Sequence, residues 1–164
     1  QSLLKCGADR IIINSEALRR ENFINEVVNI FGGQFISVSI EAKKINNKYY
    51  CMMDHGRENS NKTVSEWLNQ LNKFPIGEII LNSIDNDGME NGFNEEIIKL
   101  LFESNISCSK VVCGWAGKEK DFLNILKKYK VEGVSAATSF HFNKVNILKL
   151  KKFLFKNKLN INLL

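Results

Sequence analysis

Polar residues follow an apolar stretch near the middle of the chain, where they could bind a ligand. The apolar stretch is Gly77–Leu81, and the residues of interest after it are Asn82, Asp85, Asp87 and Gly88. In a parallel sheet, the C-terminal end of a strand is where polar groups converge on a ligand. The alternative is an ordinary strand-to-helix loop, in which Asp and Gly only form the turn.

The same order, an apolar run and then small or polar residues, recurs along the chain. The apolar runs are Arg10–Ile13, Phe35–Ile40, Gly77–Leu81, Lys110–Val112 and Gly133–Ala137. Stretches with apolar residues at helical spacing separate these runs. Strands and helices that alternate in this way are typical of parallel β/α units, so the sequence predicts an α/β fold with a parallel sheet.

One insertion interrupts the alternation. Residues Lys44–Met53 resemble a β-hairpin that turns at Asn46 and Asn47, which tolerate positive φ. A polar run then leads to a helix that begins near Thr63, whose hydroxyl can form a capping box with Glu66. A long loop of this kind is typical of the region over an active site, and the alternative is a solvated surface hairpin.

The composition favours a soluble, cytoplasmic protein. The chain is 44% hydrophobic and 25% charged, and we find neither a membrane-spanning run nor a secretory leader. The four cysteines lack metal-ligand spacing and are interpreted as reduced thiols, so no metal or cofactor is expected. The net charge of +5 comes from six lysines in the last 21 residues, which is typical of a solvated helix face. Nucleic-acid and membrane partners are therefore not expected.

Four motifs occur in a fixed order, namely Gly7–Asn14, Ser39–Lys43, Gly77–Gly88 and Ser139–Phe142. Together they resemble the HisF family, the cyclase subunits of imidazole glycerol phosphate synthase, and the likeness extends over essentially the whole chain. The family is a (β/α)8 TIM barrel, and this chain resembles its strands four to eight. The resemblance implies that residues 1–164 form a single, N-terminally incomplete TIM-barrel domain.

The activity that the resemblance implies is an ammonia-dependent cyclisation. A HisH-type glutaminase supplies ammonia through the barrel, and the cyclase condenses it with a diphosphorylated ribonucleotide. The products are imidazole glycerol phosphate, for histidine biosynthesis, and aminoimidazole carboxamide ribotide. A fragment with part of the barrel is expected to be inactive alone.

Two alternatives stay open. The first is a HisF-like paralogue that supports an amidotransferase in the synthesis of acetamidino sugars for surface polysaccharide. The segment Asn82–Asp85 resembles the corresponding segment of these paralogues. The second is a non-catalytic fragment that binds a phosphorylated ligand or a glutaminase.

The resemblance also implies a catalytic carboxylate. The family uses two aspartates as acid and base, and the one on the fifth strand falls on Glu41; the other lies on the first strand, which this sequence does not contain. Glutamate adds a methylene, and a displacement of about 1 Å in a positioned base can cost on the order of 100-fold in rate. Further departures are Asn82 for a family threonine, Cys113 for a serine and Trp115 for a glycine beside a phosphate.

The implied substrate carries two phosphates, which need two anion sites across the barrel mouth. The expected substrate- and phosphate-binding residues are Asn14, Ser15, Asn82, Asp85, Asp87, Gly88, Gly114, Trp115, Ala137 and Thr138. At the other end of the barrel, the resemblance places Arg10 and Glu78 in a charged gate for ammonia. Asp9 is expected at the edge that faces the glutaminase, with ordinary strand-end charge as the alternative.

Overall fold

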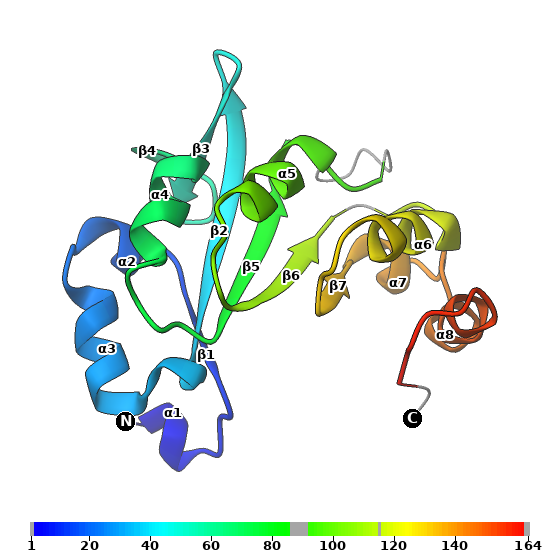
Figure 1. Ribbon diagram of the computed structural model, residues 1–164, viewed down its shortest axis with the longest axis horizontal. Helices are drawn as coiled ribbons and strands as arrows, with labels where there is room; N and C mark the ends of the chain where they lie inside the picture. The colour runs from blue at the N-terminus through cyan, green and yellow to red at the C-terminus, as the bar shows by residue number, and fades with distance from the viewer. Residues whose placement is uncertain (1, 86–91, 115, 163–164) are drawn as a thin grey trace.

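A curved sheet of seven strands organises the chain in the computed structural model, which describes residues 2–85, 92–114 and 116–162 (Figure 1). Five of the strands are parallel, and each pairs with the next in the spatial order β1 (Ile11–Ile13), β2 (Ile36–Ile45), β5 (Glu78–Ser83), β6 (Ser109–Cys113) and β7 (Gly133–Ser135). Each predicted apolar run forms one of these strands. The parallel β/α prediction is confirmed, and the architecture is part of a TIM-barrel-like α/β fold.

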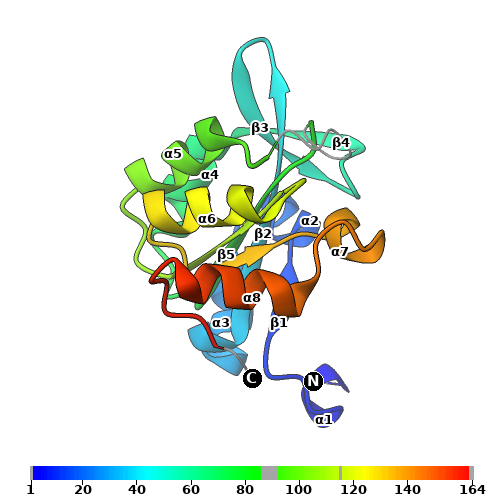
Figure 2. The same ribbon diagram turned by 90° about the vertical axis from the view of Figure 1, so that its right-hand side faces the viewer.

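Helices connect the parallel strands and bury one face of the sheet. The part of the chain that the structure describes has five long helices, α3 (Phe23–Phe31), α4 (Val64–Leu71), α5 (Glu95–Glu103), α6 (Glu119–Lys128) and α8 (Ile147–Lys156). All five coincide with predicted amphipathic stretches, and Figure 2 shows α4, α5, α6 and α8 along the same side of the sheet. None of the helices in the described part of the chain is long and apolar enough to cross a membrane.

Four short helical segments among the described residues are not predicted by the spacing of apolar residues. They are α1 (Ser2–Lys5), α2 (Ser15–Arg19), η1 (Gly33–Phe35) and α7 (Thr138–His141). None exceeds five residues, which is too short for an amphipathic period to show in the sequence.

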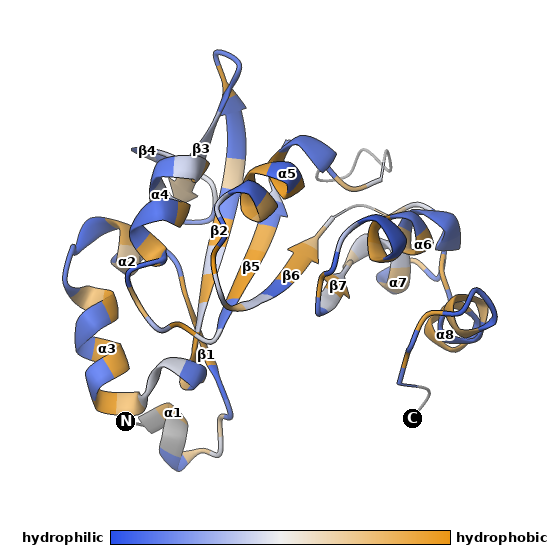
Figure 3. Ribbon diagram, viewed as in Figure 1, coloured by the Kyte–Doolittle hydropathy of each residue, from blue (hydrophilic) through white to orange (hydrophobic). Residues whose placement is uncertain are grey.

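The core lies between the long helices and the outward side chains of the strands. Along β2, Ile36, Val38, Ile40 and Ala42 are fully buried and join one apolar cluster with the helices. Figure 3 shows β5 and β6 as predominantly apolar, whereas the tip of the insertion after β2 is hydrophilic. Since side chains alternate along a strand, the residues between the core positions point to the opposite, inner face of the sheet.

The insertion is a three-stranded antiparallel extension. β3 (Lys48–Met53) pairs with the second half of β2, and Asn46 and Asn47 turn the hairpin with φ of 47° and 63°. The hairpin prediction is confirmed. The polar run after it was predicted only as a connection, and this was incomplete, because residues Glu58–Thr63 form a further strand, β4, against β3. This edge strand is held by backbone pairing, and it has no apolar side chain from which the sequence could have predicted it.

The helix α4 begins as predicted. The Thr63 hydroxyl accepts a hydrogen bond from the Glu66 N–H at 3.3 Å, and the Glu66 carboxylate accepts one from the Thr63 N–H at 2.8 Å. These reciprocal bonds form a capping box, which fixes the point where the insertion returns to the β/α pattern.

β2 changes its partner halfway along one edge. Residues Ile36–Val38 pair with β1, and Glu41–Ile45 pair with β3, while β5 occupies the other edge. Asn14 lies at this junction, where its side-chain amide donates to the backbone carbonyls of Ser39 at 3.0 Å and Met52 at 3.3 Å. The hairpin therefore stands directly beyond the C-terminal end of β1.

Candidate active site

The register of the sheet aligns four polar residues in one row, which we call the polar row. Glu41 pairs with Asn82, Asn82 with Cys113, and Cys113 with Ser135. Glu41 lies between buried Ile40 and Ala42, so its half-buried side chain points to the inner face. The row crosses β2, β5, β6 and β7 where their parallel pairing ends, which is the side of a β/α barrel that carries active sites.

A cavity of about 270 Å³ lies on this row. Its lining residues are Ser39, Ile80, Asn82, Cys113, Gly114, Ser135, Ala136 and Ala137. A larger hollow of about 540 Å³ surrounds the loop before β6, but that loop lies at the other end of the strands, away from the polar row. We therefore take the smaller cavity as the candidate site.

The residues that line the cavity are uncharged, and four of them, Ser39, Asn82, Cys113 and Ser135, have polar side chains. Burial raises the pKa of the Cys113 thiol, and a hydrogen bond with Ser135 opposes the rise only in part. The thiol therefore stays protonated near neutral pH, and a protonated thiol is a poor nucleophile. Glu41 does not line the cavity itself, but it pairs with Asn82, which does, so a carboxylate lies one strand away from the cavity.

Gly114 closes the cavity wall where β6 ends. A Cβ atom at this position would lie 2.4 Å from Cδ1 of Phe93, so a larger residue does not fit without displacing the ring. The Gly114 N–H donates to the Ser135 carbonyl at 3.1 Å. This N–H belongs to the β6–β7 pairing, so a phosphate at Gly114 would have to use another donor.

Asn14 and Ser15 follow β1, at the start of α2, and contact the end of the hairpin strand β3 and the turn after it. The Ser15 hydroxyl donates to Asn14 Oδ1 at 3.0 Å and accepts from the Asp54 N–H at 2.8 Å. Arg19 forms ion pairs with Asp54 and Glu58, and its bond to Asp54 lowers the pKa of that carboxyl. Both predicted ligand-binding side chains are thus engaged in holding the loop and the hairpin together.

The other predicted site residues fall in three groups. Asp85 is exposed, and its Oδ2 accepts from the backbone N–H of Lys44 at 2.5 Å. Ala137 lines the cavity, and Thr138 follows it as the first residue of α7. Asp87, Gly88 and Trp115, which were also predicted to bind substrate, lie outside the described residues.

An ion pair lies at the opposite end of the strands. Arg10 Nη1 is 3.1 Å from Glu78 Oε2, and the Ser37 hydroxyl donates to Glu78 Oε1 at 2.8 Å. The structure thus joins the two residues predicted as a gate. Asp9, predicted at a partner interface, is exposed beside Arg10.

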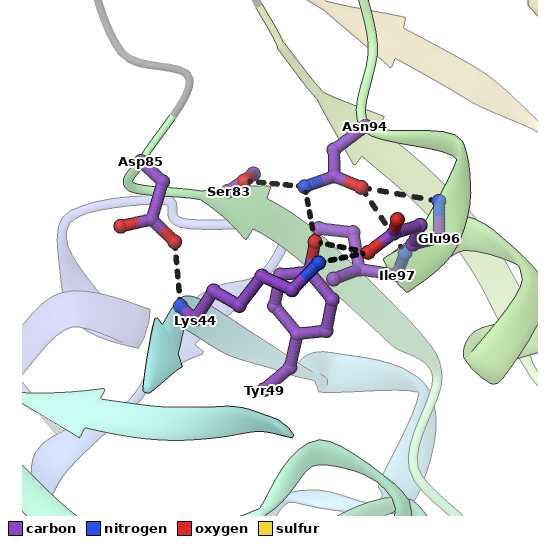
Figure 4. Close-up of polar contacts among 7 residues, drawn as sticks. All are labelled: Lys44, Tyr49, Ser83, Asp85, Asn94, Glu96 and Ile97. Carbon is purple, nitrogen blue, oxygen red and sulfur yellow. Dashed lines mark hydrogen bonds and ion pairs between the residues drawn. The ribbon is translucent and has the colours of Figure 1, made fainter. Parts of the chain in front are cut away.

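Sequence reasoning missed a polar cluster that joins the hairpin to α5, the Lys44–Tyr49–Asn94–Glu96 cluster (Figure 4). Lys44 Nζ and the Tyr49 hydroxyl both donate to Glu96 Oε2, at 2.7 and 2.8 Å. One part of it could have been found: Asn94 before two glutamates is an N-cap signal, and it caps α5. Among the described residues, no three His, Cys, Asp or Glu side chains are grouped to hold a metal ion.

Comparison with known proteins places the chain in a family. The sequence model for histidine biosynthesis proteins matches residues 1–146. The chain belongs to the histidine biosynthesis protein family. The resemblance inferred from its motifs is confirmed, because curated relatives over nearly the whole chain are HisF subunits of imidazole glycerol phosphate synthase.

Three relatives show the extent of this similarity. The HisF subunit of Campylobacter concisus is 35% identical over 161 residues, which are 98% of this chain and 63% of the relative. Those of Natranaerobius thermophilus and Sulfolobus acidocaldarius are 34% and 35% identical, again over 98% of this chain and 64% of each relative. The chain therefore spans a little under two thirds of the length of these HisF subunits.

Proposed function

We propose that the chain acts in a cyclase subunit of imidazole glycerol phosphate synthase. In this reaction, ammonia and a diphosphorylated ribonucleotide give imidazole glycerol phosphate and aminoimidazole carboxamide ribotide, in histidine biosynthesis. The observation that carries the proposal is the polar row, in which a family member presents Glu41 beside a neutral cavity at the C-terminal ends of parallel strands.

Glu41 is proposed as the general acid and base. When ammonia adds to a carbonyl carbon and the adduct loses water, a C=N bond replaces the C=O bond, the nitrogen loses two protons and the departing oxygen gains two. A single carboxylate can carry each proton in turn from the nitrogen to the oxygen. Asn82 and Ser135 are proposed to orient the substrate through hydrogen bonds without adding charge.

The ammonia is proposed to come from a HisH-type glutaminase at the opposite end of the strands. The support is the Arg10–Glu78 ion pair, which lies at that end together with exposed Asp9. The two phosphates are proposed to bind near Asn14 and Ser15 on one side and near Gly114 and Thr138 on the other. Because Asn14 and Ser15 already hold the hairpin, a phosphate there would contact a loop that is fixed in advance.

A second candidate is the acetamidino sugar paralogue. The observation that favours it is Asn82, which stands where the HisF family has a threonine and brings a side-chain amide to the cavity. Turnover of the diphosphorylated ribonucleotide by the parent chain distinguishes the two candidates.

The test replaces Glu41 by Gln in a chain of the full length of the relatives, with ammonium salt as the nitrogen source. Turnover of the diphosphorylated ribonucleotide should fall by roughly 100-fold while its affinity changes little, because only the titrating group is lost. Glu41→Asp should retain or improve activity. Glu103→Gln, an exposed change at the end of α5, is the matched control. If Glu41→Gln turns over as fast as the parent, the cyclase mechanism fails and the alternatives take precedence.

A further inference from the structure

We propose that Tyr49 and Lys44 of the hairpin are positioning residues for the candidate site, because they fasten the hairpin and the end of β5 to the first turn of α5. The inference rests on the proposed function only for the reaction that the site would perform. The fastening itself is a property of the described residues and can be tested without a substrate.

The first link is shared by both hairpin strands. Lys44 on β2 and Tyr49 on β3 are directly opposite each other in the antiparallel ladder. Both donate to the same carboxylate oxygen, Glu96 Oε2, and Lys44 Nζ lies 5.4 Å from the centre of the Tyr49 ring. The hairpin therefore contacts α5 at one carboxylate, through two donors (Figure 4).

The second link runs through Asn94. Its side-chain amide nitrogen donates to the Tyr49 hydroxyl at 3.0 Å and to the Ser83 hydroxyl at 3.2 Å. Its Oδ1 accepts from the N–H groups of Glu96 and Ile97, which caps α5. One amide thus holds the hairpin and the last residue of β5 at the same helix terminus.

The third link continues the sheet. The last backbone bond between β5 and β2 runs from the Ile84 N–H to the Ala42 carbonyl at 2.8 Å. Beyond it, the Asp85 carboxylate accepts the Lys44 N–H in place of a further ladder bond. Asn82 of the polar row lies next to Ser83, so the place of its side chain depends on a strand end that the hairpin holds from two sides.

The hydroxyl of Tyr49 is the group on which the fastening depends most. The side chains of Lys44 and Glu96 are 40% and 64% exposed, so water and salt weaken their ion pair. Tyr49 is buried, and its hydroxyl both donates to Glu96 and accepts from Asn94. Removal of this hydroxyl leaves a partly buried amide with one partner fewer, which costs more than the loss of an exposed pair.

The test is amide hydrogen exchange with Tyr49→Phe in a chain of the full length of the relatives. Tyr50→Phe is the matched control, because Tyr50 follows on the same strand, pairs with Lys43 and points to the other face. The N–H groups of Ile84 and Glu96 should exchange about tenfold faster in Tyr49→Phe and at the parental rate in Tyr50→Phe. The Gly32 N–H, bonded to Val28 at the end of α3, should keep its rate in both.

Two results would overturn the inference. One is faster exchange confined to the hairpin, because Tyr49 would then stabilise only its own strand. The other is faster exchange at Gly32 as well, because the change would then be global. Lys44→Met is a second variant, at an exposed position, and Lys43→Met is its control. Lys44→Met should speed the exchange of the Ile84 and Glu96 N–H groups less than Tyr49→Phe does, but more than Lys43→Met does.

A titration with inorganic phosphate separates the inference from the proposed function. In Tyr49→Phe, the NMR signals of the Asn82 side-chain amide should shift and phosphate should bind more weakly than in Tyr50→Phe. If phosphate does not bind the parent chain near the cavity, the proposed ligand class is wrong, and the exchange rates still decide the role of Tyr49. An unshifted Asn82 amide would count against positioning even if the hairpin loosens.

Discussion

Gly114 has no room for one additional carbon atom, because Cδ1 of Phe93 occupies that space. Phe93 in turn packs edge-on against Phe122, with ring centres 5.8 Å apart. Gly114→Ala should therefore displace Phe93 and lower the free energy of unfolding by about 1–3 kcal/mol. Urea denaturation measures the change. Phe93→Leu in the same chain should recover part of the loss, and an unchanged midpoint for Gly114→Ala would contradict the packing argument.

The charge on Glu96 makes one part of the stability depend on pH. Hydrogen bonds from Lys44 first and Tyr49 second lower the pKa of Glu96 below its ordinary value of 4.5. The folded protein therefore binds the Glu96 proton less tightly than the unfolded chain does. The contribution of Glu96 to the free energy of unfolding is complete above pH 4.5, the ordinary pKa, and is lost as the pH falls through the lowered pKa of the folded protein. Lys44→Met should raise the pKa of Glu96 in an NMR titration, and Lys43→Met should leave it unchanged. Equal pKa values in both variants would contradict the assignment.

At this scale, the sequence predicts residues whose position follows from strand alternation. Asn82, Arg10 and Glu78 could be placed near strand ends because each lies at one end of an apolar run. Glu41 was expected after its strand, but β2 continues to Ile45, because β3 pairs with its second half. The contacts of Asn14 could not be foreseen, because its acceptors lie 25 and 38 residues away on two strands that meet only in the folded sheet.

The element that most depends on one side chain is α5. Asn94 caps it through Glu96 and Ile97 and also holds Tyr49 and Ser83. Asn94→Ala should cost about 1–2 kcal/mol of unfolding free energy, measured in urea. Asn22→Ala is a matched control, because Asn22 precedes α3 without a side-chain cap bond. Similar losses in both variants would show that Asn94 acts only through helix propensity.

Strands and helices were predictable where apolar residues repeat. β2 and β5 alternate core residues with inner-face residues, and each long helix has an apolar side. β4 was not predictable, because its six residues, Glu58–Thr63, include no large apolar side chain. β4 forms because it pairs with the free edge of β3, and that edge exists only in the folded sheet.

The whole molecule has open sheet edges. In the described residues, β1 pairs with β2 alone and β7 with β6 alone, so each leaves one edge unpaired. Ile12 on β1 is 63% exposed, and Leu148 and Phe155 on α8 are 66% and 56% exposed. Unpaired edges beside apolar side chains favour association with other chains.

We therefore expect this chain, expressed alone, to form oligomers or to aggregate. Light scattering after size exclusion, over a range of protein concentrations, measures this directly. Mild salt should not abolish the association, because apolar burial is not screened by ions. A monodisperse monomer that melts cooperatively would contradict the expectation.

The partner change of β2 also has a consequence for the order of folding. Its pairing with β5 joins residues 41 positions apart, such as Ser37 and Glu78, whereas Ile45 and Lys48 meet across the two-asparagine turn. Hairpins form in about 1–10 μs, and contacts between distant residues come later because a longer loop must close. We expect the β2–β3 ladder to form early, so that one edge of β2 is already paired with β3 before β5 pairs with the other edge.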